Sequence, residues 1–311
     1  SNLTLDNLNG LLMSLLSPQV VAFIAVIEEG SFDRAAKRLS VTPSAVSQRI
    51  KQLEDKMGQL LVVRQFPCKP TPSGEQLLSR VQQMALLESE VTADLLPDAR
   101  SNIHSSTFSI AVNEDSLSTW LLKALAPLCR TYNYQFDIRV DNEDFTLEYL
   151  KNGHVIGALT CEARPLQGCV VHELGKMRYV AVATPALFER YFRHGLNVEA
   201  FQNAPMIDYD HKDFLQRRFI RTITGQEVLP RHVHYLPSAT GIVEAALLEM
   251  GWCVTLEGFL GDKLETGQLI DLAPNTALYA PLYWQHVGIR SRVLSTITNA
   301  LITESKQVLY F

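Results

Sequence analysis

Residues 31–57 read SFDRAAKRLSVTPSAVSQRIKQLEDKM, and their pattern predicts two short helices joined by a tight connection. The first helix has one apolar face, made by Ala35, Ala36 and Leu39. Thr42 is a favoured N-cap residue and Pro43 a favoured first helical residue, so we expect the second helix to begin there. Its apolar positions again follow helical spacing and are Ala45, Val46, Ile50 and Leu53.

The outward face of the second helix carries small hydroxyls, amides and cations. Its members are Ser44, Ser47, Gln48, Arg49, Lys51 and Gln52. Side chains of these types pair with base edges and phosphates when a helix enters the DNA major groove. An ordinary helical hairpin with a solvated charged face explains the same spacing, so the spacing alone leaves both interpretations open.

The charge along the chain separates this segment from the rest. The 311 residues carry a formal net charge of −5. Residues 31–80 contain nine Lys or Arg and four Asp or Glu, a local charge of +5, so the remaining residues sum to −10. A basic block on an otherwise acidic chain favours a polyanionic partner at that block, here double-stranded DNA.

The same region resembles a known family. The resemblance is to LysR-type transcriptional regulators over about residues 18–80, and it rests on Ala35-Ala36, Pro43-Ser44-Ala45-Val46-Ser47, Ile50, Leu53-Glu54 and Gly58. It implies a winged helix-turn-helix DNA-binding domain over 16–74, with a supporting helix at 18–29 and a wing at 65–72. The residues expected to contact DNA are Arg34, Thr42, Pro43, Ser44, Ser47, Gln48, Arg49, Lys51, Arg64 and Lys69. A proline-stiffened loop without a DNA role is the alternative for 65–72.

Residues 75–96 predict a longer helix, followed by a polar interdomain hinge at 97–106. Apolar side chains recur along this helix at roughly heptad spacing, at Leu77, Leu78, Val81, Met84, Ala85 and Val91. The family resemblance implies a linker helix that pairs two subunits, giving a homodimer or a homotetramer built as a dimer of dimers. Packing of the helix against its own domain is the alternative.

From residue 107 onward, predicted strands alternate with predicted helices, which indicates a mostly parallel sheet flanked by helices. The expected elements include a helix at 117–132, separate strands at 170–174 and 179–183, and a helix at 258–266. The expected fold class is therefore α/β, with an α-rich N-terminal domain.

The family resemblance adds an expected domain plan for this part. It implies an effector-binding domain at 107–311, similar to periplasmic binding proteins and made of two α/β subdomains. Subdomain I is expected at about 107–181 and 284–311, and subdomain II at about 182–283. In such folds a ligand binds between the subdomains.

Three loops follow predicted strands and precede predicted helices, so they should meet at the carboxyl ends of the strands, where such folds bind ligands. The candidate effector-binding residues in them are Asn113, Glu114, Asp115, Ser116, Asp141, Glu143, Asp144, Ser238 and Thr240. Hydroxyls at helix N-termini suit a ligand carboxylate, and five acids suit an ammonium or guanidinium group. The pattern predicts a basic amino acid, lysine or arginine, as the small-molecule effector. Acids that merely cap helix N-termini are the alternative.

Further segments resemble the arginine- and lysine-responsive branch of the LysR-type family. They are 109–127, GQLIDL at 267–272, Leu282-Tyr283-Trp284 and 290–292. The resemblance implies an activator of a basic amino-acid exporter gene or a related metabolic gene, with RNA polymerase as a candidate partner. The alternative is a LysR-type regulator that responds to another small effector or that acts as a repressor of transcription. Segment 208–230 departs from the branch pattern because it is more basic, with His211, Arg217, Arg218 and Arg221.

Other classes of protein fit the sequence less well. The histidines His172, His211, His232 and His234 lack metal-ligand spacing, and neither G-x-S-x-G nor a Gly-rich phosphate loop occurs. We therefore expect no enzyme activity, no cofactor and no metal. A solute-binding protein would explain the C-terminal two-thirds of the chain, but it would not explain the basic N-terminal block.

The composition indicates a cytoplasmic protein. The five cysteines are scattered and form no C-x-x-C pair, which is typical of reduced thiols. The sequence holds no apolar run of membrane-spanning length, so we expect no membrane partner. Its leucine-rich start contains Asp6 and no basic residue before the apolar stretch, unlike a secretory signal. Ser1-Asn2 resembles a tag remnant, and Met13 is a candidate natural start.

Overall fold

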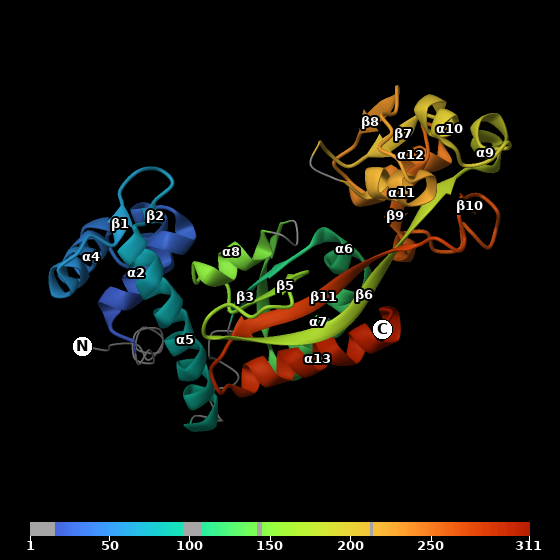
Figure 1. The fold of residues 1–311 in the computed structure, drawn as a ribbon. Coiled ribbons are helices and arrows are strands. Elements are labelled where there is room, and N and C mark those ends of the chain that lie inside the picture. The colour runs from blue at the N-terminus through green and yellow to red at the C-terminus, as the bar shows by residue number, and fades with distance from the viewer. Residues whose placement is uncertain (1–15, 96–106, 142–144, 212–213) are drawn as a thin grey trace. The chain divides into compact units, whose positions relative to one another are not determined.

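The computed structural model describes residues 16–95, 107–141, 145–211 and 214–311 (Figure 1). Contacts divide the chain into two compact units. Unit 1 comprises Ser1–Val112, Leu125–His172 and Trp284–Ala300, and unit 2 comprises Asn113–Ala124, Glu173–Tyr283 and Leu301–Phe311. Within the described ranges, no helix combines the length and the apolar character needed to cross a membrane.

Three helices form the N-terminal core of unit 1. They are α2 (Pro18–Glu29), α3 (Phe32–Arg38) and α4 (Pro43–Met57). Each begins after a hydroxyl N-cap, which is Ser17, Ser31 or Thr42, and the cap side chain accepts a backbone N–H of the first turn. Their shared core contains Phe23, Val26, Ala35, Val46 and Ile50. The predicted helix at 18–29 and the predicted start of the second helix at Pro43 are confirmed.

A short hairpin and a long helix follow this core. Strand β1 (Val62–Val63) pairs antiparallel with β2 (Lys69–Pro70), and helix α5 (Pro72–Leu95) comes next. Of the predicted seam along α5, Leu78 and Val81 are buried, whereas Met84 and Val91 are exposed. Outside that seam, Leu86 is buried and Leu87 is exposed. The predicted apolar seam is therefore divided, because one part packs within unit 1 and the other part faces outward.

A seven-stranded sheet has the order β10-β6-β11-β5-β3-β4, with β9 also paired to β6. The strands are β3 (Thr107–Val112), β4 (Gln135–Val140), β5 (Gly157–Thr160), β6 (Cys169–Ala183), β9 (Cys253–Leu256), β10 (Ile270–Asp271) and β11 (Leu278–Val287). Strand β3 pairs parallel with both β4 and β5, as the strand–helix alternation predicts. Strand β6 pairs antiparallel with β9 and β10.

The helices α7 (Leu122–Tyr132), α8 (Thr146–Lys151) and α13 (Arg292–Val308) accompany these strands. The start of α13 is held by the end of α5, because the Glu90 carboxylate accepts the Val293 N–H at 3.0 Å. Arg292 also pairs with Asp94 at 2.7 Å. In the sheet, the indole N–H of Trp284 on β11 donates to Thr298 of α13 at 3.0 Å.

In unit 2, two strands run parallel and are flanked by helices. Strand β7 (Met206–Asp208) pairs with β8 (Val233–Tyr235), and Met206 also forms a parallel bridge with Trp252, just before β9. The helices are α9 (Pro185–Tyr191), α10 (Val198–Asn203), α11 (Leu215–Thr224) and α12 (Ala239–Leu247). The Trp252 ring lies 5.2 Å from that of Phe201 and 5.9 Å from that of Phe219, centroid to centroid, so one aromatic cluster joins β9 to α10 and α11.

Two expectations about individual elements are wrong. The separate strands expected at 170–174 and 179–183 are one strand, β6, which continues through Gly175. The helix expected at 258–266 is only a 3₁₀ turn at Glu257–Phe259 followed by further turns. Gly261 and Gly267 there have φ angles of +55° and +71°, a left-handed conformation that ends a helix. The helix expected at 117–132 is helical but consists of α6 (Glu114–Ser116), a π-helical segment at Leu117–Leu121 and α7.

Packing of Trp284 against β5 gives a first prediction. A Cβ at Gly157 would lie 2.2 Å from the Trp284 Cη2 atom, so the Gly157→Ala variant must displace a buried indole. We expect it to lower the free energy of unfolding by about 2 kcal/mol, the usual cost of overpacking a core. Denaturant unfolding of the full chain measures this. Gly258→Ala is the matched control, since the nearest atom to its Cβ would be Thr119 Cγ2 at 3.3 Å. Equal stability of the two variants would contradict the packing described.

Candidate DNA-binding and effector sites

The second helix of the pair, α4, presents the polar face that the sequence predicts. Ser44, Gln48 and Lys51 are exposed, whereas Ser47 and Arg49 are half-buried. The Thr42 hydroxyl accepts the Ala45 N–H at 3.2 Å and lies 3.0 Å from the Ser44 hydroxyl. Of the other predicted DNA contacts, Arg34, Pro43, Arg64 and Lys69 are all exposed. Most of these residues are therefore accessible at the surface of the domain, and their contacts with DNA stay predictions.

A buried carboxylate connects α4 to the predicted wing. Glu54 accepts the backbone N–H groups of Leu61 at 2.9 Å and Val62 at 3.3 Å. It also pairs with the Arg64 guanidinium at 3.4 Å, and this guanidinium lies 5.4 Å from the Phe32 ring centroid. Glu54 thus fixes both the start of β1 and the arginine beside it. The sequence placed Glu54 only within the family signature and gave no sign of this connecting role.

The Glu54 contacts give a second prediction. Glu54→Gln keeps the side-chain shape but removes the negative charge. Arg64 and the backbone N–H groups of Leu61 and Val62 interact with that charge. We expect a loss of about 1.5 kcal/mol in the free energy of unfolding, in the range for hydrogen bonds to charged groups. DNA affinity should fall several-fold, because the wing is less well fixed. Thermal unfolding and DNA titration measure the two effects.

A matched control is Glu28→Gln, which removes a partly exposed ion pair with Arg38. Such pairs contribute little, so the control should stay within about 0.5 kcal/mol of the parent. If Glu54→Gln behaves like this control, the wing does not depend on Glu54.

The first candidate effector loop follows β3 and belongs to unit 2. Asn113 and Ser116 are buried, and Glu114 and Asp115 are half-buried. The Asn113 amide donates to the Met177 sulfur at 3.7 Å, and the Ser116 hydroxyl donates to the same sulfur at 3.9 Å. The Asn113 Oδ1 atom is buried and has no hydrogen-bond partner within the described residues. A buried acceptor of this kind is uncommon, and a donor on a ligand would satisfy it.

Two tyrosines hold the acids of this loop. The Tyr179 hydroxyl on β6 donates to Asp115 at 2.6 Å, and the Tyr209 hydroxyl after β7 donates to Glu114 at 3.0 Å. Burial raises the pKa of Tyr209 to about 12, and the hydrogen bond and charge of Glu114 add to this. The Tyr209 phenol is therefore neutral at physiological pH, and it does not cancel the charge of the carboxylate it contacts. The loop remains suited to a cation.

The third candidate loop precedes α12. Ser238 is the N-cap of this helix, and its hydroxyl oxygen accepts the Gly241 N–H at 3.1 Å. The Leu236 N–H donates to the Asp208 carbonyl at 2.9 Å, so the carboxyl ends of β7 and β8 lie together. Tyr209 and Ser238 follow these two strands, so both lie at the carboxyl-end edge of the β7–β8 sheet. Thr240 is exposed in the first turn of α12, where free backbone N–H groups can bind a carboxylate.

The remaining candidate effector residues are placed differently. Asp141 lies in unit 1, where its N–H donates to the Val112 carbonyl at 3.1 Å and its carboxylate accepts from Tyr149 at 3.3 Å. Glu143 and Asp144 lie outside the described residues. The structure thus brings Glu114, Asp115 and Ser116 together with two tyrosines. Sequence patterns did not single out Tyr179 or Tyr209, because each is distant in sequence from the loop that it contacts.

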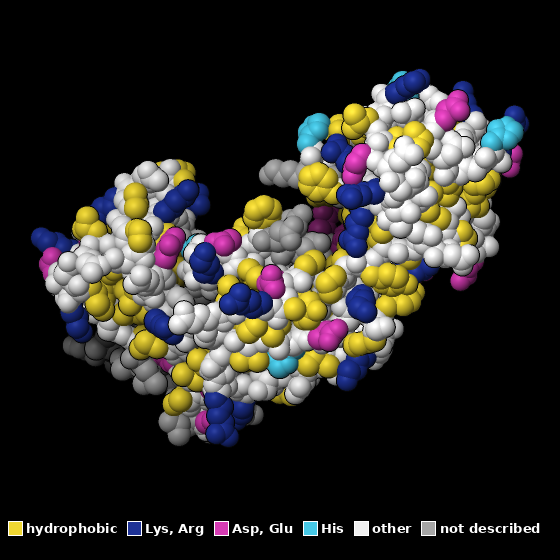
Figure 2. All heavy atoms as spheres, in the orientation of Figure 1, with side chains coloured by type: hydrophobic (Ala, Val, Ile, Leu, Met, Phe, Trp, Pro, Cys, Tyr) yellow, Lys and Arg dark blue, Asp and Glu magenta, His cyan; other side chains and the backbone are white. Residues whose placement is uncertain are grey.

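The basic segment at 208–230 lies mostly on α11. Arg221 pairs with Glu227 at 3.2 Å, and the Arg217 guanidinium lies 5.8 Å from the Phe214 ring centroid. The His211 ring lies 3.9 Å from that of Tyr235, centroid to centroid. Figure 2 shows Lys and Arg side chains at the surface around α11.

Among the other histidines, His172 and His286 form one hydrogen-bonded pair, with 3.2 Å between their Nε2 atoms. Burial lowers the pKa of His286, and the neighbouring His172 adds to this lowering. Within the described ranges, no group of three or more His, Cys, Asp or Glu side chains could hold a metal ion.

These two parts define a class of protein: a transcriptional regulator with a helix-turn-helix domain followed by an α/β ligand-binding domain. The family described as "Bacterial regulatory helix-turn-helix protein, lysR family" matches residues 18–75. The family described as "LysR substrate binding domain" matches residues 102–306. The chain therefore belongs to the LysR family of transcriptional regulators, which confirms the resemblance seen in its sequence and separates it from enzymes.

Several relatives are similar over nearly the whole chain. The HTH-type transcriptional regulator ArgP of Photobacterium profundum is 37% identical over 290 residues, covering 93% of this chain and 97% of the relative. LysG of Mycobacterium tuberculosis is 37% identical over 284 residues, covering 91% of each. The crystal structure of ArgP from Mycobacterium tuberculosis has a TM-score of 0.81 at 37% identity and covers 96% of this chain and 99% of its own.

A structure of full-length LysG from Corynebacterium glutamicum, described with bound effector Arg, has a TM-score of 0.73 at 35% identity. The match covers 95% of this chain and 100% of the LysG chain. The fold class expected from the sequence is confirmed by these similarities.

Proposed function

We propose that this LysR-family regulator responds to arginine or lysine. The observation that carries the proposal is the loop at Glu114 and Asp115, where two carboxylates adjoin a buried amide oxygen with no partner within the described residues. A guanidinium or ammonium group supplies both a positive charge and several N–H donors, which this arrangement requires. The names of the ArgP and LysG relatives, and the arginine in the Corynebacterium glutamicum structure, support the same effector class.

The rest of the ligand is assigned by chemistry. We propose that the α-carboxylate binds at the start of α12, to backbone N–H groups and the hydroxyls of Ser238 and Thr240. Asp141, Glu143 and Asp144 stay predicted contributors to the site. The proposed boundaries are a DNA-binding domain at 16–74, a linker helix at 75–96, a hinge at 97–106 and an effector domain at 107–311.

The regulatory output is proposed from the family resemblance of the sequence. We propose that the regulator activates a gene for basic amino-acid export or related metabolism when the effector is bound. The free energy available for this switch is limited to the difference in effector affinity between the two states of the protein.

Pairing of subunits is proposed through α5. Its exposed apolar side chains, Met84, Leu87 and Val91, provide a surface that a second copy would cover. Static light scattering of the full chain tests this, because a monomeric mass would contradict pairing.

The effector assignment gives a third prediction. L-arginine or L-lysine at a hundredfold excess over Kd should raise the thermal midpoint of the full chain by about 5 °C. Citrulline and norleucine keep the α-amino acid group but lack the side-chain cation, so they should produce little shift. Glu114→Gln should lower arginine affinity about tenfold, whereas Glu265→Gln, at an exposed position elsewhere in unit 2, should not change it. Equal shifts with arginine and citrulline would remove the assignment of a basic effector.

The exposed face of α4 gives a fourth prediction. Gln48→Ala should reduce the preference for operator over random DNA by about 1–3 kcal/mol, since an amide reads a base edge. Lys51→Ala should weaken binding to both DNAs alike and reduce the salt dependence by about one counterion, as expected for a phosphate contact. DNA titrations at several salt concentrations separate the two effects. If Gln48→Ala weakens both DNAs equally, Gln48 does not read a base.

A further inference from the structure

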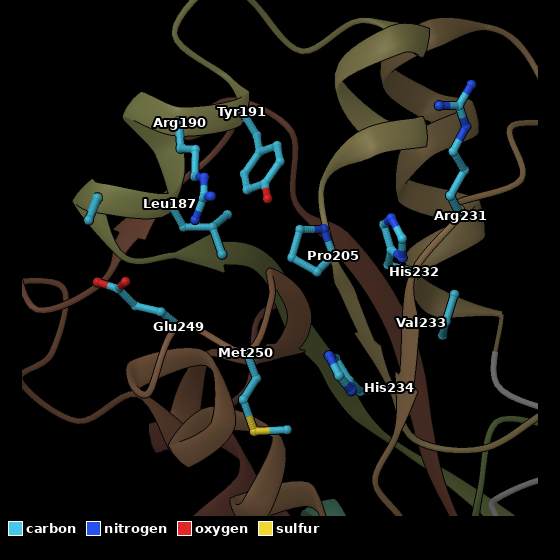
Figure 3. A pocket seen from close by; sticks show the side chains of 11 residues that line it. Leu187, Arg190, Tyr191, Pro205, Arg231, His232, Val233, His234, Glu249 and Met250 are labelled. Carbon is cyan, nitrogen blue, oxygen red and sulfur yellow. The ribbon is translucent and has the colours of Figure 1, made fainter.

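Unit 2 contains a cavity of about 790 Å³ that the proposed effector site does not use (Figure 3). Arg190 and Tyr191 of α9 line one side of it, and His232 and His234 line the other. In Figure 3 the Tyr191 hydroxyl points into the space between these two sides. The volume is large enough for a small organic ligand.

The cavity lies at the opposite end of the strands from the candidate effector loops. Its lining includes Pro205, just before β7, and His232, just before β8. These strands are parallel, so both residues mark the amino ends. Tyr209 and Ser238 follow the carboxyl ends of the same two strands. A ligand in the cavity and a ligand at the effector loops would therefore occupy separate sites.

Arg190 is the arginine of the lining whose guanidinium turns toward the cavity (Figure 3), and it belongs to none of the ion pairs formed within the described residues. Glu249 is the single carboxylate of the lining, and the Arg231 side chain points away from the cavity. The Arg190 guanidinium lies 5.5 Å from the Tyr191 ring centroid, and Arg231 donates to the Asn203 amide oxygen at 3.1 Å. The contact with Tyr191 positions the Arg190 guanidinium without neutralising it, and this group keeps its N–H donors for a ligand.

The other part of the lining is apolar. Leu187 is buried beneath the cavity, while Met250 is more than one-third exposed and lies beside it. A ligand that satisfies both parts carries an anionic head group on an apolar body. We propose that this cavity is a second ligand site, which binds a small organic carboxylate or phosphate monoester.

A purely structural role for Arg190 predicts a different outcome. Arg190 lies in the last turn of α9, where a cation stabilises the partial negative charge of the helix C-terminus. On that basis its removal would lower the stability of the free protein without changing ligand affinity. Affinity and stability must therefore be measured separately.

The test uses the full chain, saturated with L-arginine, and titration calorimetry with phenyl phosphate, phenylacetate and phenethylamine. We expect at least one of the two anions to bind, and phenethylamine, a cation of similar size, not to bind. Binding of phenyl phosphate alone or of phenylacetate alone identifies which head group the cavity takes. Saturating arginine keeps the outcome independent of the proposed effector site, and the same titrations without arginine should give the same Kd.

The variants assign the binding to this cavity. Arg190→Gln should raise the Kd of the bound anion about tenfold, the change expected when one charge-assisted hydrogen bond is lost. Arg221→Gln is the matched control, because Arg221 is an exposed arginine already paired with Glu227 outside the lining. Three results would overturn the proposal: neither anion binds, phenethylamine binds as well as the anions, or Arg190→Gln keeps the parent Kd.

Discussion

The pairing of strand β6 is the constraint on which the ligand-binding domain depends. This strand of 15 residues hydrogen-bonds to β9 and β10, and it adjoins β11 in the sheet. Because successive side chains of a strand point to opposite faces, Met177 and Tyr179 share one face and Arg178 takes the other. Met177 and Tyr179 contact the loop at Asn113–Ser116, while Arg178 pairs with Glu257. A shift of one residue would reverse these faces, so the register of β6 determines the geometry of the candidate effector loop.

The sequence predicted the N-terminal domain well because its signals are local. The N-caps Ser31 and Thr42 and the left-handed Gly58 each lie next to the helix end that they define. The effector domain was predicted less well in two places, where glycine conformation or strand pairing determines the secondary structure. Residues 258–266 have helical apolar spacing, but their glycines turn the chain. Residues 169–183 were expected to hold two strands, yet pairing with neighbouring strands keeps one strand continuous through Gly175.

The candidate sites show the same division between local and distant signals. A loop between a strand and a helix, with acids and hydroxyls, is visible in the sequence at Asn113–Ser116. Its partners are not, because Tyr179 is 64 residues and Tyr209 is 95 residues from the acids they contact. Glu54 is a similar case, since its role depends on how the chain after α4 folds back. Residue types can be predicted from local pattern, but the side chains that position them depend on tertiary folding.

Unit 2 carries charges of opposite sign at the two ends of β7 and β8. Acids with phenol partners lie near the carboxyl ends, and Arg190, which forms no ion pair within the described residues, lies near the amino ends. In an α/β arrangement, helix N-termini, which are partly positive, lie near the carboxyl ends of the strands, as α12 does after β8. The acids therefore interact favourably with the positive end of the helix dipole there, and part of their charge serves stability alone. Glu114 and Asp115 exceed that requirement because two carboxylates face a helix N-terminus that carries only about half a positive charge. Their remaining negative charge is available to a ligand, which is the physical reason for assigning a cation to this end.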